Sequence, residues 1–142
     1  LFDRLNGNSD NEDVLKAIGI FIITHIDGNW KILLVKNDKK YSFIEGMSDE
    51  TNNLICGVVI LQQKTGLDDS NIKDFVFIKS FIELYHLIYL VYLPPQIVKN
   101  IKKAKKEYHI YNYNDSKIDR ILSNENLASY KTNVVSFIDS FK

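Results

Sequence analysis

The sequence predicts an α/β fold, and three observations lead to it. Runs of β-branched and aromatic residues recur along the chain between polar turns, which is typical of strands. A segment of helical length in the middle of the chain stops at Gly66, and a second helical pattern lies near the last residue. The 142 residues are 45% hydrophobic and contain no repeat and no linker-like stretch. We therefore expect one domain over residues 1–142, with a loose polar lead-in over residues 1–13.

The first half of the chain predicts three strands followed by a helix. In chain order we expect a strand at 17–26, the hairpin turn Asp27-Gly28, a strand at 30–35, a solvated loop at 36–40, a short strand at 41–44 leading into Glu45-Gly46, and a polar loop at 48–53. The next segment, residues 53–65, is rich in leucine, isoleucine and valine and suits a buried strand almost as well as a helix. Its length and the stop at Gly66 favour the helix.

The second half predicts further strands and a closing helix. In chain order we expect strands at 75–78 and 84–93, a lysine-rich segment at 96–106, a strand at 107–113, a helical turn at 115–123 and an amphipathic helix at 128–141. The strand at 84–93 is largely apolar on both faces, as central strands are, and Pro94-Pro95 ends it.

Composition excludes several classes of protein. The chain has 18 basic and 18 acidic residues, so it is not a uniformly basic protein that coats nucleic acid. Its apolar fraction is too high for an intrinsically disordered chain. Cys56 is the single cysteine, which excludes an intrachain disulfide and fits a reducing compartment, the cytoplasm or the nucleus. No run of about 18 apolar residues is present, so we expect no membrane span.

Residues 32–69 resemble the core of a Nudix hydrolase. Members of that family carry a strand ending in LLV, the pattern W-x-F/L-P-x-G, and the Nudix box G-x5-E-x7-R-E-U-x-E-E-x-G-U, where U is apolar. Here residues 41–46, YSFIEG, resemble the WSFPKG of mRNA-decapping members, and Thr65-Gly66-Leu67 resembles the end of the box. The resemblance implies an α/β/α sandwich with a mixed sheet, with the 53–65 helix on one side and the C-terminal helix on the other.

The residues that carry the family's chemistry are replaced. When the box is aligned on its last glycine, its functional positions fall on Gly46, on or beside Thr51, and on Val59, Ile60, Gln63, Lys64 and Gly66. The interval from Gly46 to Gly66 is also one residue shorter than the box requires. The resemblance therefore implies a degenerate box, in which the arginine and the three glutamates that follow it are replaced and Glu50 lies near the position of the upstream glutamate.

The missing glutamates matter because the family's reaction needs Mg²⁺ or Mn²⁺ to bridge phosphate oxygens and activate a water. Positions i, i+3 and i+4 share one face of a helix. Here that face offers Ile60, Gln63 and Lys64, which are a hydrocarbon, an amide and a cation. We therefore expect no catalytic residue, no metal site and no cofactor. A sharper alternative is that Lys64 replaces the charge of the metal and holds a phosphate without cleaving it.

Two other groups of charged residues are candidate sites. Glu45, Asp49 and Glu50, with Glu83 as a base, are the alternative catalytic set for a displaced Mg²⁺ or Mn²⁺ site, although the loop residues also suit a solvated helix cap. Residues 99–106 contain five lysines, and three tyrosines follow them, as in a basic stripe with stacking aromatics. The expected phosphate or RNA contacts are Lys36, Lys64, Lys102, Lys103, Lys105 and Lys106. The competing interpretation of the stripe is a solvated loop or helix.

The sequence thus leads to a first hypothesis, a catalytically degenerate Nudix-fold protein. Such a protein would be a module that binds a nucleotide or RNA, or a module for the assembly of a complex. Its expected partners are RNA or a protein–RNA complex, such as an RNA-processing complex or a ribosome. The second hypothesis is a hydrolase that cleaves a nucleoside diphosphate-linked substrate with a non-standard metal site. The third is an unrelated α/β domain. Absence of a strand, loop and helix over residues 41–65, packed on a mixed sheet, would exclude the Nudix interpretation.

Overall fold

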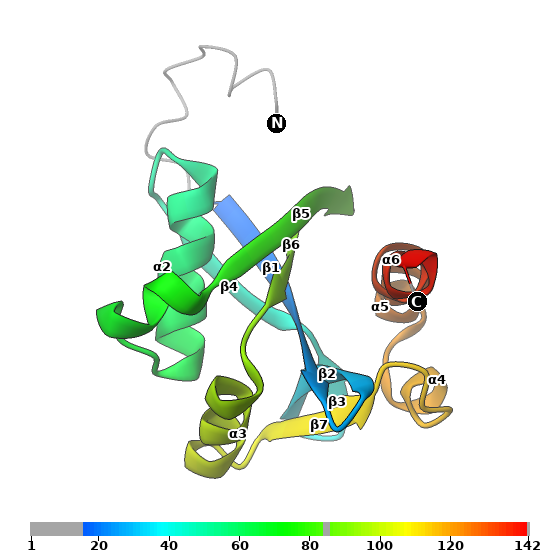
Figure 1. The fold of residues 1–142 in the computed structure, drawn as a ribbon. Helices are drawn as coiled ribbons and strands as arrows, with labels where there is room; N and C mark the ends of the chain where they lie inside the picture. The colour runs from blue at the N-terminus through cyan, green and yellow to red at the C-terminus, as the bar shows by residue number, and fades with distance from the viewer. Residues whose placement is uncertain (1–15, 84–85, 142) are drawn as a thin grey trace.

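The computed structural model describes residues 16–83 and 86–141, whose strands form one mixed sheet of seven strands (Figure 1). The strands are β1 (Lys16–Ile26), β2 (Asn29–Asn37), β3 (Lys40–Ser42), β4 (Ile44–Ser48), β5 (Val76–Glu83), β6 (His86–Tyr92) and β7 (Tyr108–Asn112). Their order is β3-β2-β1-β6-β5, while β4 pairs with β1 and β7 pairs with β2. β1 and β6 run parallel, and the other pairs are antiparallel. The predicted lead-in at 1–13 lies outside the described residues.

The predicted helix at 53–65 is confirmed as α2 (Asn53–Thr65). It begins at Asn52, whose side chain accepts a hydrogen bond from the backbone N–H of Ile55 at 3.1 Å. It ends at Gly66, which takes the left-handed conformation at φ 78° and donates its N–H to the carbonyl of Gln62 at 2.8 Å. The strand, loop and helix over residues 41–65 are therefore present.

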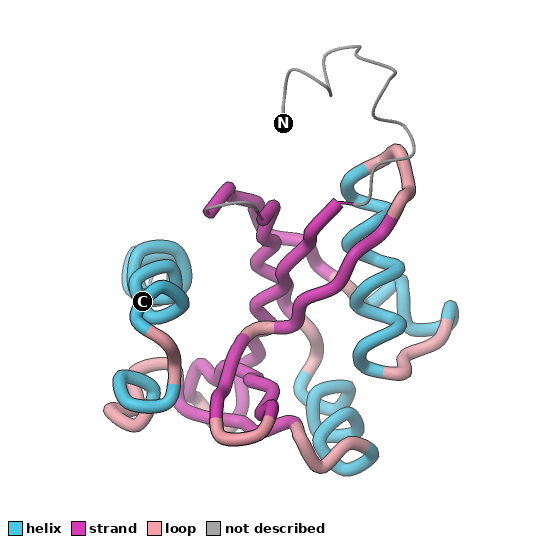
Figure 2. Tube along the Cα trace, turned by 180° about the vertical axis from the view of Figure 1, so that it is seen from behind, coloured by secondary structure: helices cyan, strands magenta, loops and turns pink. Residues whose placement is uncertain are grey.

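Helices cover both faces of the sheet, so the predicted α/β/α sandwich is confirmed (Figures 1 and 2). α2 and α3 (Pro95–Ala104) share one core cluster with the inner residues of β1, β4 and β6. The second core cluster lies on the opposite face of the sheet, where α5 (Asn124–Tyr130) and α6 (Ser136–Phe141) contribute buried side chains to it. β1 supplies both clusters because its successive side chains alternate, with Ile20 in the first and Phe21 in the second. β6 lies between β1 and β5, as predicted for a central strand.

Two predicted segments in the first part of the chain differ from the structure. The predicted strand at 41–44 is divided, and Glu45 and Gly46 lie inside the second piece, strand β4. Gly46 is needed there for packing, because a Cβ on it would lie 2.8 Å from Ile60 Cγ2. The predicted loop at 36–40 is shortened, since β2 continues to Asn37 and β3 begins at Lys40.

The later segments are also longer or more regular than predicted. β5 continues to Glu83 because it pairs with β6 along its length. The lysine-rich segment is helical in α3, which begins with Pro95 at its first position and buries Ile97, Val98 and Ile101. The remaining helical pieces are a 3₁₀ turn at Asp69–Asp74, α4 (Ile118–Ile121) and a π-helical stretch at Lys131–Val135 between α5 and α6. The closing helical segment thus starts at Asn124, four residues earlier than predicted. In the described part of the chain, no helix has the length and hydropathy needed to cross a membrane.

Candidate functional site

The face of α2 that carries the family's metal ligands does not fit a divalent cation in this chain. Ile60 is fully buried and packs beneath Gly46. Gln63 and Lys64 are exposed, and neither supplies a carboxylate. Val59 is half-buried on the same helix, and Thr51 is exposed in the preceding loop. A hydrocarbon in the core beside a surface ammonium group offers no hard anionic oxygen to Mg²⁺ or Mn²⁺.

The four alternative carboxylates come from three separate parts of the chain. Glu45 lies on β4, with its Oε1 3.4 Å from His86 Nε2. Glu83 lies on β5 and accepts a hydrogen bond from Asn133 Nδ2 at 3.3 Å. Asp49 and Glu50 lie in the exposed loop that leads to α2. Across residues 16–83 and 86–141, no three histidine, cysteine, aspartate or glutamate side chains gather as a ligand set.

Four lysines form a continuous surface on α3 and just beyond it. Lys99, Lys102 and Lys103 follow the spacing i, i+3 and i+4 on α3, which places them on one side of the helix, and Lys106 lies just beyond its end. All four are exposed, and with Tyr108 and His109 they line a surface pocket of about 460 Å³. No carboxylate in the described part of the chain forms an ion pair with them. We call these four residues the lysine face.

One residue of the lysine pocket, His109, also belongs to a row of aromatic side chains on the sheet. His109, which lines the same pocket, contacts the ring of Tyr41, with centroids 5.5 Å apart. Tyr41 also contacts Tyr111, with centroids 5.9 Å apart. The Lys36 ammonium lies 5.5 Å from the centroid of the Tyr41 ring, a cation–π distance. We call Tyr41, His109 and Tyr111 the aromatic row.

Lys105 and Lys64 are not among the residues that line the pocket of the lysine face. Lys105 does not line the pocket, and its side chain lies over Gly66, where Cε is 3.4 Å from the position of a Cβ. The hydroxyl of Tyr108 donates a hydrogen bond to the Lys64 carbonyl at 2.6 Å and ties α2 to β7. Tyr108 is only 3% exposed. This burial, and to a smaller extent the nearby Glu107 charge, raises its pKa to about 12.

Sequence reasoning missed two members of the lysine pocket. Lys99 was not among the expected contacts, although the spacing of the four lysines gives the signal. The position of His109 depends on the pairing of β7 with β2, which joins segments about 75 residues apart, so no local pattern could place it.

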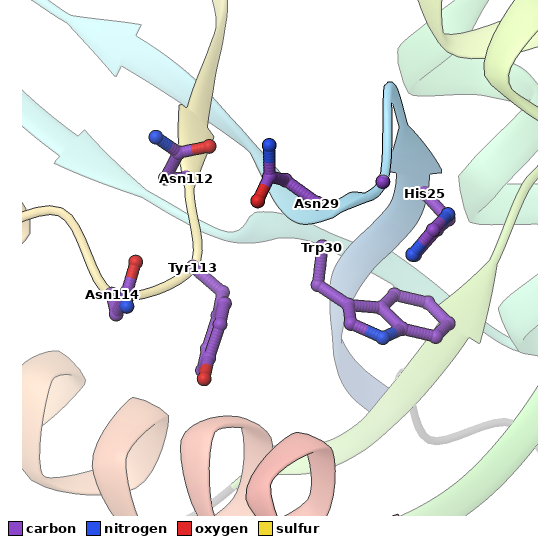
Figure 3. Close-up of a pocket in the computed structure, with 7 residues that line it drawn as sticks. His25, Asn29, Trp30, Asn112, Tyr113 and Asn114 are labelled. Atoms are coloured by element: carbon purple, nitrogen blue, oxygen red, sulfur yellow. The ribbon is translucent and has the colours of Figure 1, made fainter. Parts of the chain in front are cut away.

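A second pocket, of about 180 Å³, was also missed (Figure 3). Its main lining residues are His25, Asn29, Trp30, Asn112, Tyr113 and Asn114. The β1–β2 hairpin supplies one side and the C-terminal end of β7 supplies the other. The two sides meet because the backbone N–H of Tyr113 bonds to the Trp30 carbonyl at 3.1 Å.

Solved structures similar to this one identify the fold. A mutT/nudix family protein from Listeria innocua matches with a TM-score of 0.57 and 15% identity, over 89% of this chain and 94% of that one. The Ap4A hydrolase of C. elegans matches with a TM-score of 0.63 and 12% identity, over 88% and 98% of the two chains. NrtR of Shewanella oneidensis, in complex with a 27mer DNA, matches with a TM-score of 0.56 and 13% identity, over 82% of this chain and 58% of that one. The sequence matches no protein-family profile and no curated protein. The chain is a Nudix-fold domain.

Proposed function

We propose that this chain is an RNA-binding Nudix-fold protein that does not hydrolyse its ligand and that works as a component of an RNA–protein assembly. The observation that carries the proposal is the lysine face, four exposed lysines around one pocket without an ion-pair partner in the described part of the chain. Lysine side chains are point cations suited to phosphate oxygens.

The absence of hydrolysis follows from the chemistry of α2. Cleavage of a phosphoanhydride on this fold needs carboxylates that hold a divalent cation, which activates water and neutralises developing charge. Ile60 fills the space beneath Gly46 with hydrocarbon, and Gln63 and Lys64 provide an amide and a positive charge. The Lys64 ammonium can attract a phosphate, but it cannot polarise a water as a metal ion does.

RNA is the favoured ligand because His109 joins the lysine pocket to a row of aromatic side chains. Proteins that bind single-stranded nucleic acid combine lysines that follow the backbone with aromatic rings that stack on bases. The lysine face supplies the first element, and the aromatic row with Lys36 supplies the second. Among similar folds, NrtR of Shewanella oneidensis is solved in complex with DNA, but this chain covers only 58% of its length, so the proposal rests on the lysines.

Binding is tested with a fluorescein-labelled single-stranded RNA and the full chain, by anisotropy from 50 to 200 mM KCl. Each lysine that neutralises a phosphate of a single strand contributes about 0.7 to the slope of log K against log salt, so we expect a slope near −3. The variant Lys102→Ala/Lys103→Ala should lower the magnitude of this slope by about 1.4. The matched control is Lys73→Ala/Lys117→Ala, which removes two exposed lysines from other elements. Equal slopes for the two double variants would refute the lysine face as the RNA contact.

Hydrolysis is tested separately with dinucleoside polyphosphates, ADP-ribose, nucleoside triphosphates and capped RNA in Mg²⁺ or Mn²⁺. We expect no product above a protein-free control. Product that disappears in Asp49→Ala/Glu50→Ala, or in Glu45→Gln or Glu83→Gln, would instead establish the alternative hydrolase with a displaced metal site.

A further inference from the structure

Strand β5 is an edge of the sheet, and the register of its neighbour shows which of its backbone groups point outward. The strand order ends at β5, which pairs with β6 on one side. The N–H of Leu93, directly after β6, bonds to the Ile23 carbonyl at 3.1 Å, so the odd-numbered residues of β6 direct their backbone groups toward β1. The even-numbered residues, such as Ile88 opposite Phe81, therefore direct theirs toward β5. The odd-numbered residues of β5 from 79 to 83 complete these bonds, and the even-numbered residues point away from the sheet.

Ser80 and Ile82 are the residues that point their N–H and C=O groups outward. Within residues 16–83 and 86–141, these groups have no hydrogen-bond partner on the outer side of β5. Both side chains are exposed, and that of Ile82 is 45% exposed. The pairing of β5 with β6 shifts its register between Phe77 and Lys79, which limits regular pairing along the edge to residues 79–83. An open edge of this kind is a template for one further short strand.

Residues 79–83 are complementary to a second copy of themselves. Lys79, Phe81 and Glu83 lie on one face of β5, because side chains alternate along a strand. When two copies pair antiparallel about Phe81, Lys79 of each copy lies directly opposite Glu83 of the other. In the same register, Ser80 of each copy lies opposite Ile82 of the other, so the outward backbone groups meet in two hydrogen-bonded pairs.

Other antiparallel registers of this segment fit less well. Pairing about Lys79, or about Glu83, would place like charges directly opposite each other, which is destabilising. Pairing about Ser80, or about Ile82, would leave the other outward residue without an outward partner inside residues 79–83. The register about Phe81 satisfies both the charges and the outward hydrogen-bonding groups.

The two charged groups of this face are positioned but form no ion pair within the described part of the chain. The Lys79 ammonium lies 5.9 Å from the centroid of the Phe81 ring and 5.6 Å from that of Phe137. Glu83 accepts a hydrogen bond on Oε1 from Asn133 Nδ2 at 3.3 Å, and its second oxygen can accept from a lysine. A cation and an anion on one strand face therefore remain available to a second copy.

We propose that the chain forms a symmetric dimer in which β5 pairs antiparallel with β5 of a second copy, with Phe81 at the twofold axis. The sheets of the two copies then join into one continuous sheet. Such an assembly is closed, because each copy uses its own β5 edge in the pairing. The dimer goes beyond the proposed RNA contact, since β7 pairs with β2, on the other side of β1 from β5.

Self-association is tested by sedimentation velocity of the full chain over a hundredfold range of concentration. We expect the mass to rise from 16.5 kDa to twice that value. In Glu83→Lys, two facing pairs change from attraction to repulsion, so the dissociation constant of the dimer should rise about tenfold, and Lys79→Glu should act alike. An equimolar mixture of the two variants should dimerise as the wild type does, because opposite charges then meet at both positions. The matched control Lys73→Glu reverses an exposed lysine outside β5 and should leave the mass unchanged.

The register is tested by oxidative crosslinking of single cysteine variants. Opposite residues of a non-hydrogen-bonded pair have Cα atoms about 4.5 Å apart, which suits a disulfide. Phe81→Cys should therefore crosslink two copies, whereas Val76→Cys should not, although Val76 is 50% exposed. The native Cys56 is buried and does not compete.

A mass of 16.5 kDa at every concentration would overturn the proposed dimer. A dimer that both charge reversals leave unchanged would also overturn it, and so would stronger crosslinking through Val76→Cys than through Phe81→Cys. Recovery of the dimer in the mixture of the two charge variants shows that each variant is folded, and failure to recover it would contradict the pairing of Lys79 with Glu83.

Discussion

Restoring the family's glutamate at position 60 should destabilise the protein strongly. Ile60 is fully buried between α2 and the β4 strand, directly beneath Gly46. In Ile60→Glu, the apolar side chain is lost and a carboxyl group enters a space without a cation or a free donor in the described surroundings. We therefore expect that Ile60 occupies the family's glutamate position as part of the core, and that this position has no room for a carboxylate.

The magnitude follows from the burial of Ile60. Removing a buried isoleucine side chain costs about 2–5 kcal/mol, and leaving a buried polar group without a partner adds about 1–3 kcal/mol. We expect the free energy of unfolding to fall by about 3–8 kcal/mol at pH 7. Because burial raises the pKa of a carboxyl group above its unfolded value, the loss should be smaller below pH 4 and larger as the pH rises through the folded pKa.

The assay is urea unfolding followed by Trp30 fluorescence and circular dichroism at pH 4 and pH 7. Gln63→Glu is the matched control, because it places a carboxylate on the exposed side of the same helix and should change stability by less than about 0.5 kcal/mol. An Ile60→Glu variant that is within about 1 kcal/mol of the wild type at pH 7 would refute the reasoning. Such a result would mean that the box face remains open to a carboxylate.

Two further predictions concern the hairpin turn and a buried tyrosine. Gly28 has φ 82°, and nothing lies within 4 Å of a Cβ placed on it, so only backbone strain opposes a side chain there. In urea unfolding, Gly28→Ala should lower the stability by about 1–2 kcal/mol, whereas the control Asp27→Asn should be nearly neutral. Equal effects of the two substitutions would contradict this. Tyr108 has a pKa of about 12 in the folded protein and about 10 when unfolded, so the stability it contributes is complete below pH 10 and should fall by about 2–3 kcal/mol from pH 10 to 12. The difference between wild type and Tyr108→Phe over that range isolates this effect, and parallel curves would exclude it.

Local patterns predicted the elements whose signals are local. The helix at 53–65 could be predicted because Gly66 stops it, and the first hairpin because Asp27-Gly28 adopts positive φ angles. Strand β4 was not predicted, because the strand expected at 41–44 was ended before Glu45 and Gly46. Gly46 is instead required by Ile60, fourteen residues away, and that packing is visible only in three dimensions.

The candidate sites depend on contacts that no single segment contains. The lysine face could be predicted in part, because the lysine spacing lies within one helix. Its junction with the aromatic row depends on the register Val35↔Tyr108 between β2 and β7. The pocket of about 180 Å³ at the β1–β2 hairpin depends on the same pairing, which brings the end of β7 beside the start of β2. Long-range strand pairing of this kind is not encoded in a local periodicity.

The most direct test of the central claim is ultraviolet crosslinking of a 4-thiouridine-labelled single-stranded RNA to the full chain in the presence of Mg²⁺. The crosslinked peptides are mapped by mass spectrometry, and the length of the RNA is measured afterwards. The account predicts crosslinks in α3 and at Tyr41 and Tyr111, to RNA that remains intact. Crosslinks confined to α2 and β4, or RNA that is cleaved or loses its cap, would contradict it.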